Sequence, residues 1–590
     1  MNANLNSLFT EIELAQTPWK IKGVSEFDTK MTGRCGFIIE GLGIKFDCGV
    51  QFEKPGPTFL TCTKYGNVRE LPSTYLVPIE ESSTEKQIVI LPEKIADSVK
   101  NFVVGAMMMT KSTRDPSTLK ISFDFTMTND TDCINMKIKN IRFKIEPLQN
   151  GYGFTEIRTK LNDEYKGLTQ HELSELKKKG VDICHDKEIP SFCYVSNISN
   201  EIFSLEKSKI KKYINVVLSC PFLFPEDKEK AAELGCLHWS DIEHFIASNS
   251  STKFIVCGFS VSYDYKTLTD FFSAIGFANV IPHVNMHHPN LHMMNAHMFK
   301  EVTVPQTLYK LKGSSEAARR TGFLMEIKKN VAVKLDCGVE IGETTENVPI
   351  FVTHSHYDHV RELPSAGLKM KMQGKKQTVV IPQKIINSVK NYVKATYAMV
   401  DPTLNVNDMF DFVSMNDTDP IYIKLGDTNF KIEPFKCTHS TSCLGYGFIE
   451  IRDGEEIPIF CYIGDTDHRV LVTEKAKLEK YIIIIIECTF IFPEDKKKAK
   501  KDKHMYVEYL NVFAESHPLT TLILYHFSLR YNYKTITEFF ASQKIVNLIP
   551  FVNKFLHEGN VQDVCCEHED QEDHEEDEKD EGDNEGNLVQ

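Results

Sequence analysis

The chain of 590 residues lacks any long hydrophobic run. The apolar run Ile482–Ile486 is much too short to span a bilayer and is typical of a buried strand. The N-terminal stretch MNANLNSLFTEIELAQ also lacks a basic region followed by an apolar core, so we expect no signal peptide. These absences predict an intracellular protein that is not secreted and contacts no membrane, located in the cytoplasm or, alternatively, in the nucleus.

A regular cysteine framework is missing as well. The 16 cysteines have no regular spacing, which together with the absent export signal predicts reduced thiols. The net charge is −14, but residues 567–590 contain 13 acidic residues and one lysine, which leaves −2 for the rest of the chain. This end has no apolar periodicity and is expected to be a disordered acidic tail. Acidity therefore does not exclude a nucleic-acid substrate, because local patches bind phosphate.

The length exceeds one ordinary core, and internal repeats indicate a duplication. Related segments recur at an offset that falls slowly along the chain from about 290 residues. The matching pairs are Thr17–Gly23 with Thr307–Gly313, Phe46–Val50 with Leu335–Val339, Val68–Ser73 with Val360–Ser365, Phe222–Lys228 with Phe490–Lys496, and Asp264–Thr269 with Asn532–Thr537. We expect two related domains in tandem.

Within each copy, short β-branched runs alternate with helical patterns. The run at residues 87–95 overlaps the start of a helical pattern over 92–103. The run at residues 377–381 directly precedes another helical pattern over 382–393. This alternation predicts the α/β class, with strands buried between helices.

One stretch of the second copy concentrates metal-ligand chemistry. An apolar run leads into His354, His356, Asp358 and His359, which are three imidazoles and one carboxylate within six residues. A strand that delivers an HxHxDH loop places neutral nitrogens and a hard oxygen around one small volume, which suits Zn²⁺. We interpret the stretch as a metal site rather than a solvated polar loop.

The first copy has lost all four of these residues. Cys62, Lys64, Gly66 and Asn67 stand at the equivalent positions, and Lys64 would place a cation where the metal should lie. We predict that this loop keeps its shape without holding a metal.

Three further strand ends of the second copy carry ligand-type residues, namely His439, Asp465 and His526. The first copy deletes the equivalent of His439 and has Asn197 and Gly258 in place of the other two. Because these residues vanish in the copy that also lost HxHxDH, we predict that all of them share one metal centre.

The second half thereby resembles the metallo-β-lactamase superfamily and, more narrowly, ribonuclease Z (tRNase Z), the tRNA 3′-processing endonuclease. The resemblance covers nearly all of residues 305–555. It is carried by Leu335–Gly338, the HxHxDH motif at 354–359, His439, Gly464–Thr466, Glu487–Phe490, His504 and His526–Tyr531. It implies tandem metallo-β-lactamase domains, each an αββα sandwich and the first degenerate, as in the long two-domain members.

The resemblance also implies a ligand set for two Zn²⁺ ions in the active half, with other divalent metals left open. One ion would be held by His354, His356 and His439, the second by Asp358, His359 and His526, and Asp465 would bridge them.

Three residues are implied as catalytic: Asp358, Glu487 and His504. Asp358 would orient or deprotonate the attacking water, and Glu487 would hold His504 protonated as the proton donor. The alternative for His504 is a charged residue at the end of the lysine-rich stretch Lys496–Lys503. Asp336 is expected to orient a ligand histidine rather than to bind metal.

The first half adds a segment, Tyr165–Val181, that resembles the flexible tRNA-binding arm of ribonuclease Z. Without the resemblance it would be interpreted as an amphipathic surface helix with a basic end. The second copy lacks this insertion and has only the short segment Ile451–Glu456 in the equivalent region. The candidate substrate contacts are Gly167, Leu168, Lys177 and Lys178 in the arm, and Arg530 in the second half. The lysines of 496–503 either contact phosphates or form a solvated charged helix.

We therefore expect a degenerate domain at 1–281 with its arm at about 155–190, a His-rich linker at 282–304, a catalytic domain at 305–562 and the tail at 563–590. The five histidines of the linker are spaced too irregularly to favour a second metal site. The chain would act as a monomer, an intramolecular pseudo-dimer.

The resemblance implies a zinc-dependent endoribonuclease that removes the 3′ trailer of precursor tRNA by metal-hydroxide attack and leaves a 3′-hydroxyl on the tRNA. One alternative is another hydrolase on the same fold, such as a small-nucleotide phosphodiesterase or a thioester hydrolase. The other is a non-catalytic RNA-binding scaffold, which the intact ligand set of the second half argues against.

Overall fold

The structure, a computed structural model, describes residues 10–553 except 29–32, 53–55, 77–85, 112, 114, 116, 118, 120–122, 130, 285–298, 306, 318, 342–346 and 440. Most of the predicted linker and all of the predicted acidic tail lie outside the described residues. The described cysteines form no disulfide. Within the described part of the chain, every helix is too short or too polar to cross a bilayer.

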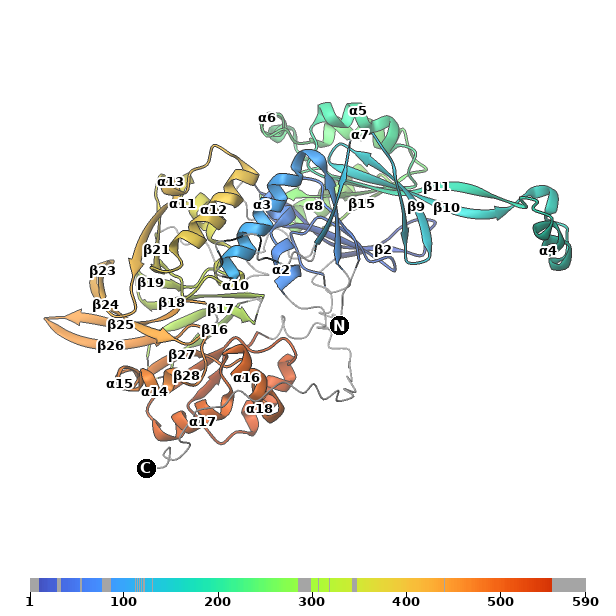
Figure 1. Cartoon of the computed structure of the whole chain (residues 1–590). Coiled ribbons are helices and arrows are strands. Elements are labelled where there is room, and N and C mark those ends of the chain that lie inside the picture. Colours follow the sequence, from blue (N-terminus) through green and yellow to red (C-terminus); the bar gives the residue numbers. More distant parts are fainter. Residues whose placement is uncertain are drawn as a thin grey trace.

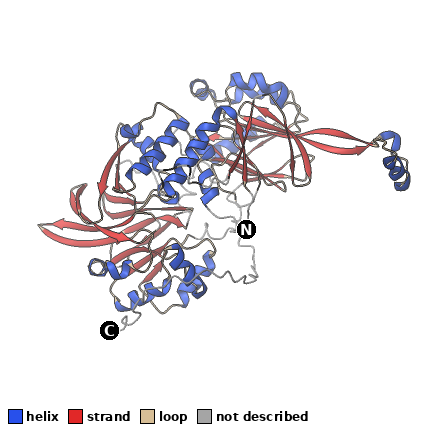
Figure 2. Ribbon diagram, viewed as in Figure 1, coloured by secondary structure: helices blue, strands red, loops and turns tan. Residues whose placement is uncertain are grey.

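The first half consists of two facing sheets with helices on their outer sides (Figures 1 and 2). One sheet has the order β1 (Thr10–Glu13), β2 (Lys20–Phe27), β3 (Cys35–Glu40), β4 (Ile44–Phe46), β5 (Thr58–Phe59), β6 (Gln87–Pro92), β7 (Phe123–Thr128), and β14 (Phe259–Ser260) pairs with β2. The other has the order β15 (Val280–Pro282), β13 (Lys253–Cys257), β12 (Asn215–Ser219), β11 (Cys184–Val195), β10 (Gly151–Leu161), β9 (Ile141–Leu148), β8 (Ile134–Ile138). Its helices are α1 (Tyr65–Val68), α2 (Leu71–Leu76), α3 (Glu93–Thr110), α4 (Gln170–Lys178), α5 (Asn200–Ile210), α6 (Lys228–Glu233), α7 (Trp239–Ala247) and α8 (Tyr265–Ile275).

The second half repeats this arrangement. One sheet has the order β16 (Lys300–Thr303), β17 (Lys310–Glu316), β18 (Arg320–Lys328), β19 (Val331–Leu335), β20 (Ile350–Phe351), β21 (Gln377–Pro382), β22 (Phe410–Met415). The other has the order β23 (Ile421–Leu425), β24 (Thr428–Cys437), β25 (Cys443–Arg452), β26 (Glu455–Tyr462), β27 (Ile483–Glu487), β28 (Thr521–Tyr525), β29 (Leu548–Pro550). Its helices are α10 (Tyr357–Val360), α11 (Leu363–Met372), α12 (Ile386–Val400), α13 (Val406–Met409), α14 (Val470–Thr473), α15 (Lys475–Leu478), α16 (Lys496–Asp502), α17 (Val507–Ser516) and α18 (Tyr533–Ser542). The predicted α/β class is confirmed.

Each pair of sheets encloses a core of aromatic and β-branched side chains. In the second half Phe351 lies between Tyr446 and Phe448, and Phe448 stacks on Phe460 with ring centroids 4.4 Å apart. The first half places Phe59, Tyr152, Phe154 and Phe192 in the same arrangement. Aromatic and aliphatic side chains on the inner faces of the strands drive this sheet-on-sheet packing.

The repeated sequence motifs have repeated structural roles. Asp264 and Asn532 cap α8 and α18, because each side chain accepts a hydrogen bond from the backbone amide three residues later. Asp227 and Asp495, in the two Phe-Pro-Glu-Asp segments, each accept a hydrogen bond from a tyrosine hydroxyl of their own half.

The Val-Arg-Glu-Leu-Pro-Ser motif builds the contact between the halves. Arg361 Nη1 of the second half lies 2.7 Å from Glu70 Oε2 of the first, and Arg69 Nη1 of the first half lies 3.5 Å from Glu362 Oε2 of the second. All four side chains are buried. Because each pair joins opposite halves, the two motifs make reciprocal contacts, like the self-complementary interface of a homodimer.

Apolar packing surrounds these ion pairs. One continuous core combines residues of both halves, including Phe102 on α3 and Tyr392 on α12. Gly105 on α3 brings the two helices close, since a Cβ there would lie 3.3 Å from Ala395 Cβ. The halves thus share a hydrophobic interface rather than a loose tether.

The first half carries a long projecting arm. Strands β10 and β11 pair along their whole length, from Gly151 opposite Val195 to Leu161 opposite Cys184, and α4 lies at the tip (Figure 1). Thr169 starts α4 in a capping box with Glu172. The equivalent strands β25 and β26 are joined at Asp453 and Gly454 alone. The hairpin of the first half therefore projects farther from its sandwich than the hairpin of the second (Figure 1).

Candidate metal centre

The candidate ligands converge on one edge of the second sandwich, where several strands end. Strand β20 leads into the loop that contains His354 and His356, and α10 follows with Asp358 and His359. His439 lies in the loop between β24 and β25. The remaining two, Asp465 and His526, follow β26 and β28. Residues separated by up to 172 positions thus meet because their strands terminate at the same edge.

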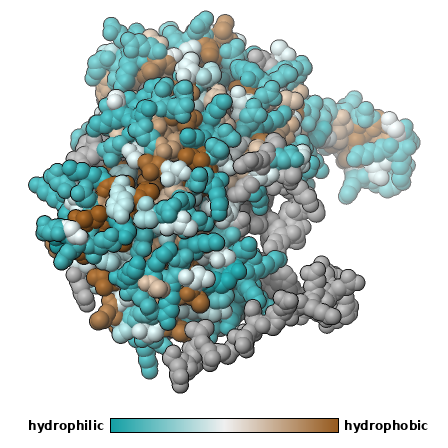
Figure 3. All heavy atoms as spheres, turned by 60° about the vertical axis from the view of Figure 1, so that its left-hand side comes forward, coloured by the Kyte–Doolittle hydropathy of each residue, from teal (hydrophilic) through white to brown (hydrophobic). Residues whose placement is uncertain are grey.

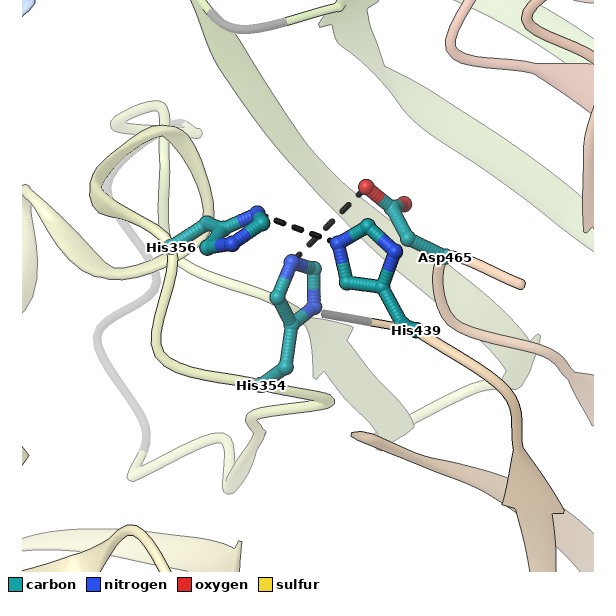
Figure 4. A group of neighbouring side chains, drawn as sticks. All are labelled: His354, His356, His439 and Asp465. Carbon is teal, nitrogen blue, oxygen red and sulfur yellow. Dashed lines mark hydrogen bonds and ion pairs between the residues drawn. The ribbon is translucent and has the colours of Figure 1, made fainter. Parts of the chain in front are cut away.

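Three groups of ligand-type atoms form at this edge, and the third, Asp465, His504 and His526, shares a residue with each of the other two. The first contains His354, His356, His439 and Asp465 (Figure 4), and the second contains Asp358, His359 and His526. In each group the ligand atoms lie within 4.8 Å of one another. His439 Nε2 lies 3.2 Å from His356 Nδ1, and His354 Nε2 lies 3.7 Å from Asp465 Oδ2.

Asp465 lies between the two groups. Its Oδ2 atom is 3.6 Å from His359 Nε2 and 3.4 Å from His526 Nε2, besides its approach to His354. Asp358 Oδ2 lies 3.5 Å from Nε2 of both His359 and His526. A carboxylate in this position can contact an ion in either group.

The chemistry of these atoms fits a metal. Nε2 of His354, His359 and His526 and both carboxylate oxygens of Asp465 are buried without a hydrogen-bond partner among the described residues. Leaving so many buried polar atoms unpaired is costly unless something binds them. Imidazole nitrogens and carboxylate oxygens facing one another at 3.4–3.7 Å are the donors that divalent transition metals take.

The protonation states of His354, His356, His439 and Asp358 agree with this fit, whereas that of His359 does not. Burial lowers the pKa of His356 to about 4 and places the pKa values of His354 and His439 well below the usual range. These three imidazoles are therefore neutral and available as ligands. Burial opposes the charge of Asp358, but His359 and His526 outweigh it and lower the pKa of Asp358 to about 2. Burial also acts against a charged His359, yet Asp465, Asp358 and Asp336 raise the pKa of His359 overall.

Neighbouring groups orient the ligands. Asp336 Oδ2 lies 2.8 Å from His359 Nδ1 and accepts a hydrogen bond from the Tyr462 hydroxyl at 2.6 Å. Asp336 therefore contacts a histidine of the candidate ligand set, as the predicted orienting role requires. His439 Nδ1 lies 3.3 Å from the Lys503 carbonyl oxygen, so its Nε2 faces the site.

Glu487 and His504 form a buried pair beside the ligands. His504 Nδ1 lies 2.8 Å from Glu487 Oε1. Burial disfavours a charged His504, but the Glu487 carboxylate prevails and raises the pKa of His504 to about 9. The imidazole is therefore charged at neutral pH. Its ring lies 4.9 Å from that of His439 and 5.4 Å from that of His526, which places a protonated imidazole next to the candidate ligands.

Sequence reasoning missed Thr489. Its hydroxyl donates to Glu487 Oε2 at 2.5 Å and lies 3.1 Å from His526 Nδ1 and 3.3 Å from His504 Nδ1. The first half has Pro221 at this position, so comparing the copies at every residue between Glu487 and Phe490 would have revealed the difference.

The backbone at His526 is strained, with φ of 64°. Residues other than glycine seldom adopt this left-handed conformation, and such strain clusters at functional sites. The equivalent Gly258 has φ of 71° without that strain. The second half therefore keeps a histidine where the local backbone favours glycine.

The equivalent edge of the first half keeps the framework and replaces the ligands. Asp47 is hydrogen-bonded to Thr61, Asn67 and Tyr194. Asp336 is hydrogen-bonded to the equivalent residues Thr353, His359 and Tyr462. At the ligand positions, Lys64 Nζ donates to Asn197 Oδ1 at 2.9 Å, and Asn197 Nδ2 lies 3.5 Å from Cys62 Sγ. An ammonium and two amides stand where the second half has imidazoles and carboxylates.

The predicted substrate contacts of the arm lie apart from this centre (Figure 1), whereas Arg530 packs over Phe490, whose ring lies 6.5 Å from that of His504. Gly167 and Leu168 precede α4 at the tip of the arm, and Lys177 and Lys178 end that helix. The arm recedes at the right of Figure 3, where its tip mixes hydrophilic and hydrophobic residues. Arg530 is half-exposed in an ion pair with Asp495, its Nη2 lying 2.6 Å from Oδ1, so its guanidinium already has a structural partner.

The lysine-rich stretch forms α16. Lys496 pairs with Glu508 and Lys498 with Asp502, so part of its charge is neutralised within the fold. Lys503 adopts a left-handed conformation with φ of 57° and ends the helix directly before His504.

The chain is similar in sequence to one described family and to proteins named ribonuclease Z or tRNase Z. The family described as Anti-Pycsar protein Apyc1 matches residues 315–540. The ribonuclease Z of Borreliella burgdorferi (strain ZS7) is 26% identical over 229 residues, covering 31% of this chain and 69% of the relative. The tRNase Z TRZ1 of Arabidopsis thaliana is 22% identical over 218 residues, covering 32% of this chain and 75% of the relative.

Among solved structures, a long-form RNase Z from yeast matches 85% of this chain and 93% of its own length, with 10% identity and a TM-score of 0.50. The predicted tandem metallo-β-lactamase fold is confirmed by this match across both halves, and the predicted resemblance to ribonuclease Z is confirmed by the named relatives.

Proposed function

We propose that this ribonuclease Z-like chain of the metallo-β-lactamase superfamily is a metal-dependent endoribonuclease that removes the 3′ trailer from precursor tRNA. The observation that supports this most is the combination of a complete ligand set in one half with a long projecting arm on the other. A hydrolase of small nucleotides or thioesters needs no additional half that carries an arm, so we rank those activities lower.

The proposed ligands of one Zn²⁺ are His354, His356 and His439, those of the second are Asp358, His359 and His526, and Asp465 is shared. When bound, two such ions acidify a water molecule and offset negative charge on a phosphoryl oxygen. Asp358 is placed to orient that water or to accept its proton, since its Oδ2 atom faces both His359 and His526.

His504 serves as the proton donor in this proposal. Strand cleavage that leaves a 3′-hydroxyl on the tRNA requires a proton on the departing 3′-oxygen. Glu487 holds the imidazole charged through Nδ1 at 2.8 Å, which leaves Nε2 to give up its proton. Thr489 fixes the carboxylate by donating to its second oxygen.

The first half would present the substrate. In this proposal residues 1–281 and 305–562 act as two domains joined by the predicted linker at 282–304, although its segment Lys300–Thr303 forms β16 and pairs with β17 of the second half. Gly167, Leu168, Lys177 and Lys178 contact the tRNA. Lysines at the tip would bind phosphates without reading sequence. The shared hydrophobic interface supports a monomer that works as an intramolecular pseudo-dimer. We place this activity inside the cell, in the cytoplasm.

The test is cleavage of a 3′-extended precursor tRNA by the wild-type protein and by His356→Ala, with the cut mapped at nucleotide resolution. We expect a metal-dependent cut directly after the discriminator nucleotide, lost in the variant. Metal-loaded protein that leaves the precursor intact but hydrolyses small phosphodiesters would reject the assignment.

A further inference from the structure

The first half contains a pocket at the position equivalent to the metal centre. Its volume is about 270 Å³, and its walls include Phe27, Lys64, Asn67, Asn197 and Gly258. Val400, at the end of α12 in the second half, closes one side. The loss of the metal ligands has therefore left an open site rather than a filled one.

Lys64 puts a positive charge into this pocket at the position of His356. Its ammonium donates to Asn197 Oδ1 at 2.9 Å and lies 4.9 Å from the centre of the Phe27 ring. Neither partner carries a negative charge, so these contacts orient the ammonium without neutralising it. The equivalent space of the second half contains imidazoles that could bind a metal cation. In the first half, the Lys64 ammonium occupies this space.

Other groups of the pocket suit an anion. Asn197 supplies an amide whose Nδ2 atom lies 2.9 Å from Ser196 Oγ, and Ser219 also lines the wall. A Cβ at Gly258 would lie 2.4 Å from Ser219 Oγ, so the hydroxyls of Ser219 and Ser25 line the wall at the position from which His526 extends in the second half. Two carboxyl groups, Glu26 and Asp28, also line the pocket. The guanidinium groups of Arg34 and Arg69 attract the Glu26 carboxylate and act against the repulsion from Asp28.

We propose that this first-half pocket binds a phosphate group on a ligand of about mononucleotide size and does not hydrolyse it. Lys64 takes the place of the metal as the positive charge that the phosphate contacts, and Asn197 holds the ammonium in position. Hydrolysis is absent because Cys62, Gly66 and Asn67 supply no metal-ligand set at the positions of His354, Asp358 and His359. The proposal does not depend on the reaction assigned to the second half.

The test is calorimetric titration of the metal-loaded full chain with uridine 5′-monophosphate. Removing a charge-assisted contact to a phosphate weakens binding by about tenfold or more. We expect Lys64→Met to remove one binding event that His356→Ala leaves in place. The matched control is Lys94→Met, which removes an exposed lysine of α3 outside the pocket and should leave the titration unchanged.

A second variant keeps the proposal testable if Lys64→Met does not fold. Asn197→Asp turns the amide next to Lys64 into a carboxylate, which pairs with the ammonium and repels phosphate, and asparagine and aspartate tolerate the left-handed φ of 52° equally. It should also lose the first-half event. Inorganic phosphate that binds as tightly as the nucleotide would support the site and identify the free anion as its ligand. Unchanged stoichiometry and affinity in both pocket variants would overturn the proposal.

Discussion

The two halves of this chain share one framework and differ at its ligand positions. Asp47 and Asp336 hold the same network of a threonine, a tyrosine and one α1 or α10 side chain at the same edge. Above that network, one half has seven metal-ligand residues and the other has an ammonium, amides and glycines. The comparison shows that the buried aspartate has a structural role that does not require a metal.

The halves also differ in what they extend toward solvent. The β10–β11 ribbon of the first half carries α4 well away from its sandwich, whereas β25 and β26 turn back at Asp453 and Gly454 (Figure 1). Each half has therefore kept a feature that the other has lost, while the reciprocal Arg–Glu contacts keep the two joined.

The largest effect is expected from the ligand positions. His356→Ala should lower the rate of precursor cleavage by at least about 10³-fold, because it removes an imidazole from the first ligand group. The first-half control is Cys62→Ala, at the position equivalent to His354, which should leave the rate unchanged. Single-turnover cleavage measures both, and an equal loss in the two variants would contradict the difference between the halves.

Glu487→Gln should lower kcat by roughly 10²–10⁴-fold, because it removes the carboxylate that keeps His504 protonated. The first half has Ser219 at this position and no equivalent proton donor. The protonated donor is present below the pKa of His504, about 9, and is lost as the pH rises through that value. Without the carboxylate, this alkaline limb should move down toward the ordinary histidine pKa of about 6.5. A pH–rate profile for both proteins checks the shift, and an unmoved limb would remove His504 from the donor role.

The reciprocal ion pairs predict unequal losses of stability. Arg361→Met leaves Glu70 buried without its 2.7 Å partner and should cost about 3–5 kcal/mol. Arg69→Met should cost less, about 1–3 kcal/mol, because its contact is 3.5 Å long and Glu362 Oε1 still lies 3.5 Å from Arg361 Nε. Urea unfolding midpoints compare the two variants, and the reverse order would show that the pairs are not organised as described.

The smallest effect is expected from the arm. Replacing residues 162–183 by Asp-Gly, the turn of the second half, should weaken precursor tRNA binding by about tenfold and flatten its salt dependence. Hydrolysis of bis(p-nitrophenyl) phosphate should persist, because the arm tip lies far from the ligand groups. A tRNA affinity that does not change would remove the arm from substrate binding.

Much of this arrangement could be predicted from the sequence, because ligand-type residues directly follow the apolar patterns that mark buried strands. HxHxDH follows a β-branched run, and the loss of its residues in the first copy pointed to His439, Asp465 and His526 as partners. The structure brings all of these side chains together.

Other features could not be predicted, because they depend on contacts between distant segments. The repeat Val-Arg-Glu-Leu-Pro-Ser marked a duplication, but only the fold shows that Arg361 faces Glu70 rather than its own Glu362 alone. Thr489 was missed because a single hydroxyl carries no spacing signal. The pocket around Lys64 likewise arises from packing, including Val400 of the other half.

The central claim is that one half holds the metal chemistry and the other does not. The most direct measurement is the number of divalent ions bound per chain, determined by elemental analysis of the purified protein and of His356→Ala. We predict two ions per wild-type chain and fewer in the variant. Four ions per chain, or an unchanged count in the variant, would contradict the division between the halves.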